Sequence, residues 1–153
     1  ALITTKSEGI YTLKTNYFIA PEAIENKENK LERNKFKNVN IKDLILEEEY
    51  FNAGKQILYL EQTEKILEQF QNWDDFYYWS SFVYYNLGNY AQALENVEQI
   101  LNKENNPETL FLEALINRDN GDTYKSNQIL NYIIKEFSNN DYASYAKDIL
   151  NDE

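Results

Sequence analysis

Residues 77–94 read YYWSSFVYYNLGNYAQAL, and residues 110–126 read LFLEALINRDNGDTYKS. Each stretch holds an apolar run at helical spacing, then a glycine, and then a polar residue that opens a second run. The two glycines, Gly88 and Gly121, lie 33 residues apart. A period of this length is typical of stacked helical hairpins, each of which buries its apolar face only against the next one. The sequence therefore predicts an array of helix pairs.

The composition narrows the kinds of function that the chain supports. Its 153 residues are 42% hydrophobic and 15% aromatic, which suits one domain with a proper core. The formal net charge is -11, so we expect neither a nucleic-acid partner nor attraction to an anionic membrane. His and Cys are both absent, which removes imidazole bases, thiol nucleophiles and ordinary zinc sites. We therefore expect no cofactor, no metal and no enzymatic activity.

Membrane insertion is also not expected, because no apolar run is long enough to cross a bilayer. The sequence contains no Met, even at its first position. We therefore expect a processed chain, with any targeting segment or anchor upstream of it.

The first 40 residues differ from the rest of the chain. Residues 1–5 and 10–19 are rich in β-branched and aromatic side chains, and residues 7–9 separate them with a turn sequence. This pattern is typical of a β-hairpin or an extended arm, while a poorly ordered terminus is an equal alternative. Residues 21–42 are polar and suit a linker or a short helix. We expect an N-terminal arm and linker over residues 1–40 and a helical domain over residues 41–153.

The helical spacing of apolar residues becomes plain from Asp43 onward. It predicts a long helix over residues 43–60, a short helix around 66–70, and then helices that start at Asp74 and Asn89. Gly88 and Gly121 are expected to end helices in the left-handed conformation. The triplet at 106–108, Asn-Pro-Glu, predicts a cap followed by a first-turn proline. The last two helices are expected around residues 123–137 and from about 141 to the end.

The hairpins resemble the tetratricopeptide repeat over about residues 43–153. The family's first helix follows the pattern W-x2-L-G-x2-Y, and its second follows A-x3-F. Residues 77–84 and 93–97 are similar to these two patterns, and the first pattern recurs from Tyr50, Leu110 and Tyr142. Small residues at Ser81 and Ala93 would let the two helix backbones approach closely. The resemblance implies an all-α, TPR-like α-solenoid with a C-terminal capping helix and a non-repeat arm.

A looser resemblance lies in residues 134–146, which read IKEFSNNDYASYA. Bacterial envelope repeat proteins, such as the outer-membrane assembly lipoproteins, often show a similar join between repeats. This resemblance implies a location in the bacterial periplasm or cell envelope, with the cytoplasm as the alternative.

The first helices of successive hairpins line the concave face in this family. Projection of the repeat pattern places mostly aromatic and apolar side chains on that face: Phe51, Lys55, Leu58, Tyr59, Tyr78, Phe82, Tyr85, Phe111, Leu115 and Arg118. Such a groove suits a peptide or partner segment with apolar anchors. Alternatively, residues 76–85 are apolar nearly all round and lie between neighbouring helices, or the N-terminal arm fills the groove. Trp79 is expected to face away from the groove.

Three other kinds of site do not fit the sequence. The family's chaperone-binding members clamp a C-terminal carboxylate with Lys and Asn, but the matching positions here are mostly aromatic. The acids at 47–49 are consecutive and so do not share a helix face, which argues against paired catalytic carboxylates. Residues 119–122 lack the preceding acid that a calcium loop requires.

The sequence as a whole predicts a non-enzymatic scaffold that binds a protein or peptide segment in an aromatic concave groove. The alternative is a structural assembly subunit of a bacterial cell-envelope complex. In that case the N-terminal arm would make the main partner contact.

Overall fold

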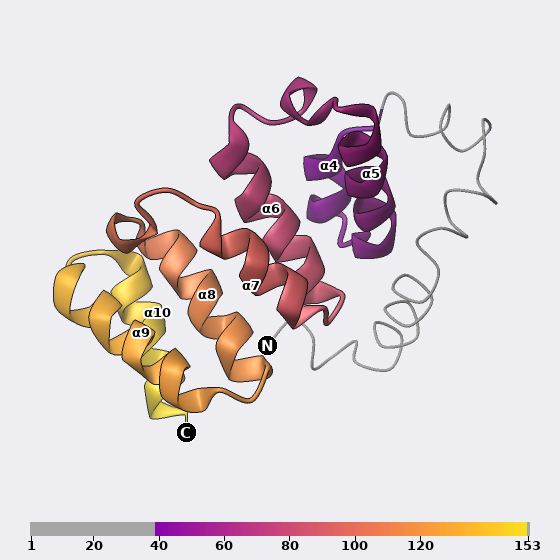
Figure 1. The fold of residues 1–153 in the computed structure, drawn as a ribbon. Coiled ribbons are helices and arrows are strands. Elements are labelled where there is room, and N and C mark those ends of the chain that lie inside the picture. The colour runs from indigo at the N-terminus through magenta and orange to yellow at the C-terminus, as the bar shows by residue number, and fades with distance from the viewer. Residues whose placement is uncertain (1–38, 153) are drawn as a thin grey trace. The chain divides into compact units, whose positions relative to one another are not determined.

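The computed structural model describes residues 39–152, and every regular element in that range is helical (Figure 1). The predicted all-α class is therefore confirmed for this part of the chain. The predicted arm falls almost entirely outside the described residues. The helices form two compact units, one that ends at Asn89 and one that starts at Tyr90.

Unit 1 contains α4 (Ile41–Leu46), α5 (Tyr50–Thr63), the short 3₁₀ helix η1 (Ile66–Glu68) and α6 (Trp73–Asn86). The prediction of one long helix over residues 43–60 is wrong, because the helix is interrupted between α4 and α5. Glu48 there is in the left-handed region with φ 58°. The amide of Glu49 then donates to the carbonyl of Leu44 at 2.8 Å, which closes the end of α4. The predicted second helix is only the single turn of η1.

A polar clamp joins the start of α4 to the turn after η1. The side chain of Gln69 accepts from the amide of Ile41 at 2.8 Å and donates to the carbonyl of Val39 at 2.9 Å. Lys42 adds an ion pair with Asp75 at 3.0 Å. The bond to the amide of Ile41 satisfies a group that a helix start leaves without an intrahelical partner.

Helix α6 begins and ends at residues with clear local signals. Its N-cap is Asn72, whose side chain accepts from the amide of Asp75 at 2.8 Å, so the predicted cap at Asp74 is wrong by two residues. Gly88 follows the helix with φ 78°, and the amide of Asn89 donates to the carbonyl of Tyr84 at 2.8 Å. The predicted left-handed stop at Gly88 is confirmed.

Unit 2 contains α7 (Tyr90–Glu98), the 3₁₀ helix η2 (Lys103–Asn105), α8 (Pro107–Asp119), α9 (Thr123–Glu136) and α10 (Asp141–Asn151). The last three are capped by the side chains of Asn106, Asp122 and Asn140, in that order. The predictions of a cap and first-turn proline at 106–107 and of a stop at Gly121 are confirmed.

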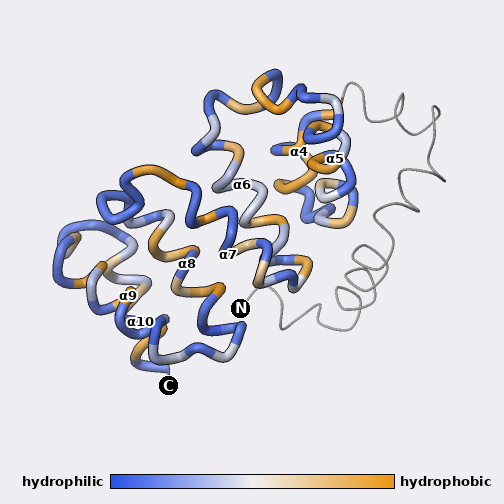
Figure 2. Tube along the Cα trace, viewed as in Figure 1, coloured by the Kyte–Doolittle hydropathy of each residue, from blue (hydrophilic) through white to orange (hydrophobic). Residues whose placement is uncertain are grey.

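The core of unit 2 lies between α8, α9 and α10. Its buried members are Leu110, Ala114, Leu130, Ile133, Ala143 and Ala146. Hydropathy alternates along these helices, as expected when one side is buried and the other meets water (Figure 2). Within residues 39–152, no helix has the length and apolar character needed to span a bilayer.

Candidate partner-binding surfaces

Nine of the ten side chains predicted to line the groove are partly exposed. The tenth, Tyr85, is only 1% exposed and so offers no surface to a partner. Seven of the ten belong to unit 1, and Phe111, Leu115 and Arg118 belong to unit 2. We therefore describe two separate surfaces, one in each unit.

The surface of unit 1 is built around Phe82 on α6. The centroid of its ring lies 6.1 Å from that of Tyr50 on α5 and 5.8 Å from that of Trp79, and Trp79 in turn lies 5.1 Å from Tyr78. We call these four residues the α5–α6 aromatic cluster. The sequence pattern placed Trp79 away from the groove residues, but its ring contacts two of them.

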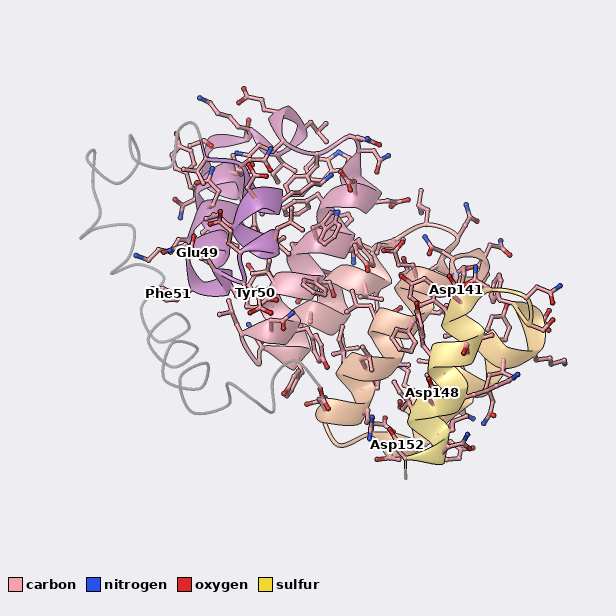
Figure 3. The ribbon with its side chains drawn as sticks, turned by 180° about the vertical axis from the view of Figure 1, so that it is seen from behind. Glu49, Tyr50, Phe51, Asp141, Asp148 and Asp152 are labelled. Atoms are coloured by element: carbon pink, nitrogen blue, oxygen red, sulfur yellow. The ribbon has the colours of Figure 1, made fainter. Side chains whose placement is uncertain are left out.

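The predicted residues on α5 do not all belong to this cluster. The ammonium of Lys55 lies 5.0 Å from the ring centroid of Phe51, one helical turn away. Figure 3 shows Tyr50 and Phe51 leaving the start of α5 on different sides. Phe51 and Lys55 thus form a cation–π pair on α5.

A second group of aromatic residues in unit 1 was not predicted as a binding surface. Trp73, at the start of α6, is 49% exposed, and its ring centroid lies 6.0 Å from both Phe76 and Tyr77. The spacing of three and four residues that joins these rings is visible in the sequence. The repeat pattern predicted contact residues at other positions, so the spacing of these three aromatic residues was missed.

The surface of unit 2 is built around Phe111 on α8. Its ring centroid lies 5.5 Å from Tyr142 and 6.1 Å from Tyr145, both on α10, and the two tyrosines are 5.5 Å apart. The repeat pattern aligned Tyr145 with Ser80 and Glu113, which are 0% and 4% exposed, whereas Tyr145 is 48% exposed. Helix α10 is the last helix of the described residues. An aromatic residue where the other copies carry Ala, Ser or Glu was the signal for this surface.

A buried ion pair lies elsewhere in unit 2. Lys103 on η2 contacts Glu98 at 2.7 Å and the buried Glu113 at 3.2 Å. Burial raises the pKa of Glu113, although Lys103 opposes this effect. The hydrogen bond from Lys103 lowers the pKa of the more exposed Glu98. The pair links η2 to α8, so we assign it a structural role.

No three metal-ligating side chains gather at one place in the part of the chain that the structure describes. The partly exposed aromatic rings are the candidate binding groups of the two surfaces. Rings of this kind bind apolar side chains and cations.

Comparison with known proteins adds no relative to this picture. No family model matches the chain, and neither a curated protein nor a solved structure matches it. The resemblance to the tetratricopeptide repeat thus stays a prediction.

Proposed function

We propose that this chain is a non-enzymatic scaffold of TPR-like hairpins that binds a segment of a partner protein through aromatic side chains. The observation that carries the proposal is the partial exposure of nine of the ten predicted contact residues. Contiguous apolar patches are uncommon on folded monomers and often mark interaction sites, and aromatic residues are enriched in protein interfaces.

Packing in unit 2 supports the repeat arrangement. Helices α8 and α9 pack together, and α10 contacts both of them. The link between α8 and α9 is short, which favours antiparallel neighbours. A hairpin followed by a helix that packs on both of its members is the arrangement expected of one repeat and the first helix of the next.

Each of the two surfaces has one proposed anchor, Phe82 in unit 1 and Phe111 in unit 2. Each is partly exposed, and each is held in place by neighbouring rings. A rigid aromatic side chain loses little conformational entropy when a partner covers it, so it is a good candidate for a central interface residue.

The test uses the full chain immobilised as bait in an extract of the source cells. The captured protein is identified, produced separately and titrated against the wild type, Phe82→Ala and Phe111→Ala. We expect each truncation to weaken binding by more than about 1 kcal/mol, as for central interface residues. Phe137→Ala is the matched control, because Phe137 is also a partly buried aromatic residue but lies outside the predicted contact set.

Circular dichroism must show that all three variants are folded, since truncation of a buried Phe costs about 3–5 kcal/mol. Folded variants with wild-type affinity would refute the proposal. If deletion of residues 1–38 abolished binding while both Phe variants bound normally, the alternative of an assembly subunit with a binding arm would be favoured.

A further inference from the structure

The aromatic surface of unit 2 is lined with acidic side chains. Asp141 and Asp148 lie on α10, and Asp152 directly follows its last residue, as Figure 3 shows. Their spacings of seven and four residues place them on one side of the helix. Tyr145 lies on the same side, four residues after Asp141 and three before Asp148. Its exposed ring thus stands between carboxylates.

The neighbouring helix adds a further acid to this surface. Burial raises the pKa of Tyr142, and the charges of Glu108, Tyr145 and Asp141 raise it further. Glu108 is in the first turn of α8, and Phe111 follows it by three residues. The negative potential therefore extends from α10 across the rings to α8.

Cations of the described chain do not neutralise these acids. Within residues 39–152, the ion pairs formed by lysines do not include Glu108, Asp141, Asp148 or Asp152. Lys147 is two residues after Tyr145 and so points to another side of α10. Arg118 lies two turns beyond Phe111, at the opposite end of α8.

Helix stability explains only some of these acids. Asp141 is in the first turn of α10, where a negative charge interacts favourably with the helix dipole. Asp148 and Asp152 lie at the other end of the same helix, where negative charge is unfavourable. Their placement beside an exposed tyrosine is better explained by an external positive charge.

We propose that this acidic aromatic face binds a basic segment of a partner protein. The face is formed by Glu108, Phe111, Asp141, Tyr142, Tyr145, Asp148 and Asp152. A Lys or Arg side chain lies over the Tyr145 ring, its charged group pairs with the flanking aspartates, and its aliphatic stem covers the rings. This inference rests on the proposed function and names the partner's chemistry.

Charge complementarity selects this occupant over a second copy of the chain. The formal net charge of the whole chain is -11, so a second copy would bring net negative charge to a negative face. A basic partner would be attracted instead, and its affinity would fall with added salt. Salt dependence thus separates this face from a contact made by apolar anchors alone.

The probe is a short fluorescent peptide that carries Lys and Leu at helical spacing, titrated against the full chain by fluorescence anisotropy. Peptides of the same design with Gln or Glu in place of Lys are run beside it. We expect the Lys peptide alone to bind measurably. Tyr145→Ala should weaken its binding about two- to fivefold, the range of an exposed cation–π contact. Tyr145→Phe retains the ring and should bind like the wild type.

Charge variants are compared at equal net charge. Asp141→Asn/Asp148→Asn should weaken binding about two- to tenfold at low salt, from two exposed ion pairs. Glu47→Gln/Glu68→Gln removes the same charge from exposed positions in unit 1 and should change binding less than about twofold. Tyr124→Ala, at a tyrosine that is 75% exposed on α9, is the matched control for Tyr145→Ala.

Several results would overturn the inference. Equal weakening by the two charge variants would show attraction to the whole acidic chain rather than to this face. Failure of the Lys peptide to bind would contradict the inference directly. Self-association in sedimentation that Tyr145→Ala abolishes would assign the face to a second copy. A gain in peptide affinity on deletion of residues 1–38 would assign it to the chain's own N-terminal segment. All of these leave the scaffold function standing, because that is tested with the captured partner.

Discussion

At the residue scale, the clearest stability prediction concerns Ala93. Ala93 on α7 is 0% exposed, whereas Ala91 on the same helix is exposed. We expect Ala93→Leu to destabilise the protein by about 1–3 kcal/mol, because there is no room for the added methyl groups. Ala91→Leu should change the free energy of unfolding by less than about 0.5 kcal/mol. Chemical denaturation of both variants measures the difference.

The same argument applies in unit 1. Ser81 on α6 is 0% exposed, and Ser81→Leu should cost about 1–3 kcal/mol. Ser144→Leu makes the same change at an exposed position of α10. If Ser81→Leu and Ser144→Leu unfold at the same denaturant concentration, Ser81 does not lie in a tightly packed place.

The buried ion pair predicts a stability difference that depends on pH. Lys103→Met leaves Glu113 buried without its cation, and we expect a loss of about 1–3 kcal/mol at neutral pH. Burial already raises the pKa of Glu113 in the folded state. Its contribution to stability is therefore greatest at acidic pH and is lost as pH rises through that pKa.

Glu98 has the opposite pH dependence, but it too pairs with Lys103 only while it is ionised. Lys103 lowers its pKa, so the stability that Glu98 contributes in the wild type is present at neutral pH and lost on acidification. The destabilisation by Lys103→Met should therefore shrink as pH falls through the titration of both acids. Denaturation at several pH values tests this, with the exposed Lys147→Met as the control. A difference that is constant with pH would contradict the prediction.

At the element scale, the ends of the helices follow local rules. Gly121 has φ 94°, and an added Cβ would meet nothing within 4 Å. Gly121→Ala therefore costs only backbone strain, which we expect to be about 1–2 kcal/mol. Gly121→Asn should cost less, because Asn tolerates this conformation better. An unchanged denaturation midpoint for Gly121→Ala would show that the turn relaxes freely.

The sequence predicted these ends well where one residue type carries the signal. Gly88 and Gly121 end helices because glycine adopts positive φ without strain, and Asn106 caps α8 because its side chain reaches the amide of Thr109. The break at Glu48 carries no such signal, since glutamate is an ordinary helix former and is left-handed here only in its tertiary setting. This is why α4 and α5 were predicted as one helix.

The candidate surfaces were predicted less completely than the helices. The repeat pattern gives each residue a direction relative to its own helix, so it found Phe82 and Phe111. It does not tell which rings of adjacent helices meet, and so it missed the contact of Tyr145 on α10 with Phe111 on α8. The contact of Trp79 with Phe82 lies within α6, and its spacing of three residues could be read from the sequence. The burial of Tyr85 could not be predicted either, because exposure depends on the neighbours that the fold supplies.

At the scale of the whole molecule, residues 39–153 are expected to form a predominantly helical protein when expressed without the N-terminal segment. The caps, stops and buried positions of all described helices lie within this range. A far-ultraviolet circular dichroism spectrum dominated by β signal would contradict this prediction. A helical spectrum that melts without a sigmoidal transition would contradict the presence of a packed core.

The clamp made by Gln69 has a consequence for hydrogen exchange. First-turn amides of a helix usually exchange quickly, because they have no partner within the helix. The amide of Ile41 is instead bonded to a side chain 28 residues away. Its exchange rate should therefore report the opening of the turn after η1 rather than fraying of α4. Slow exchange of the Ile41 amide would thus report a hydrogen bond between two segments that are distant in the sequence.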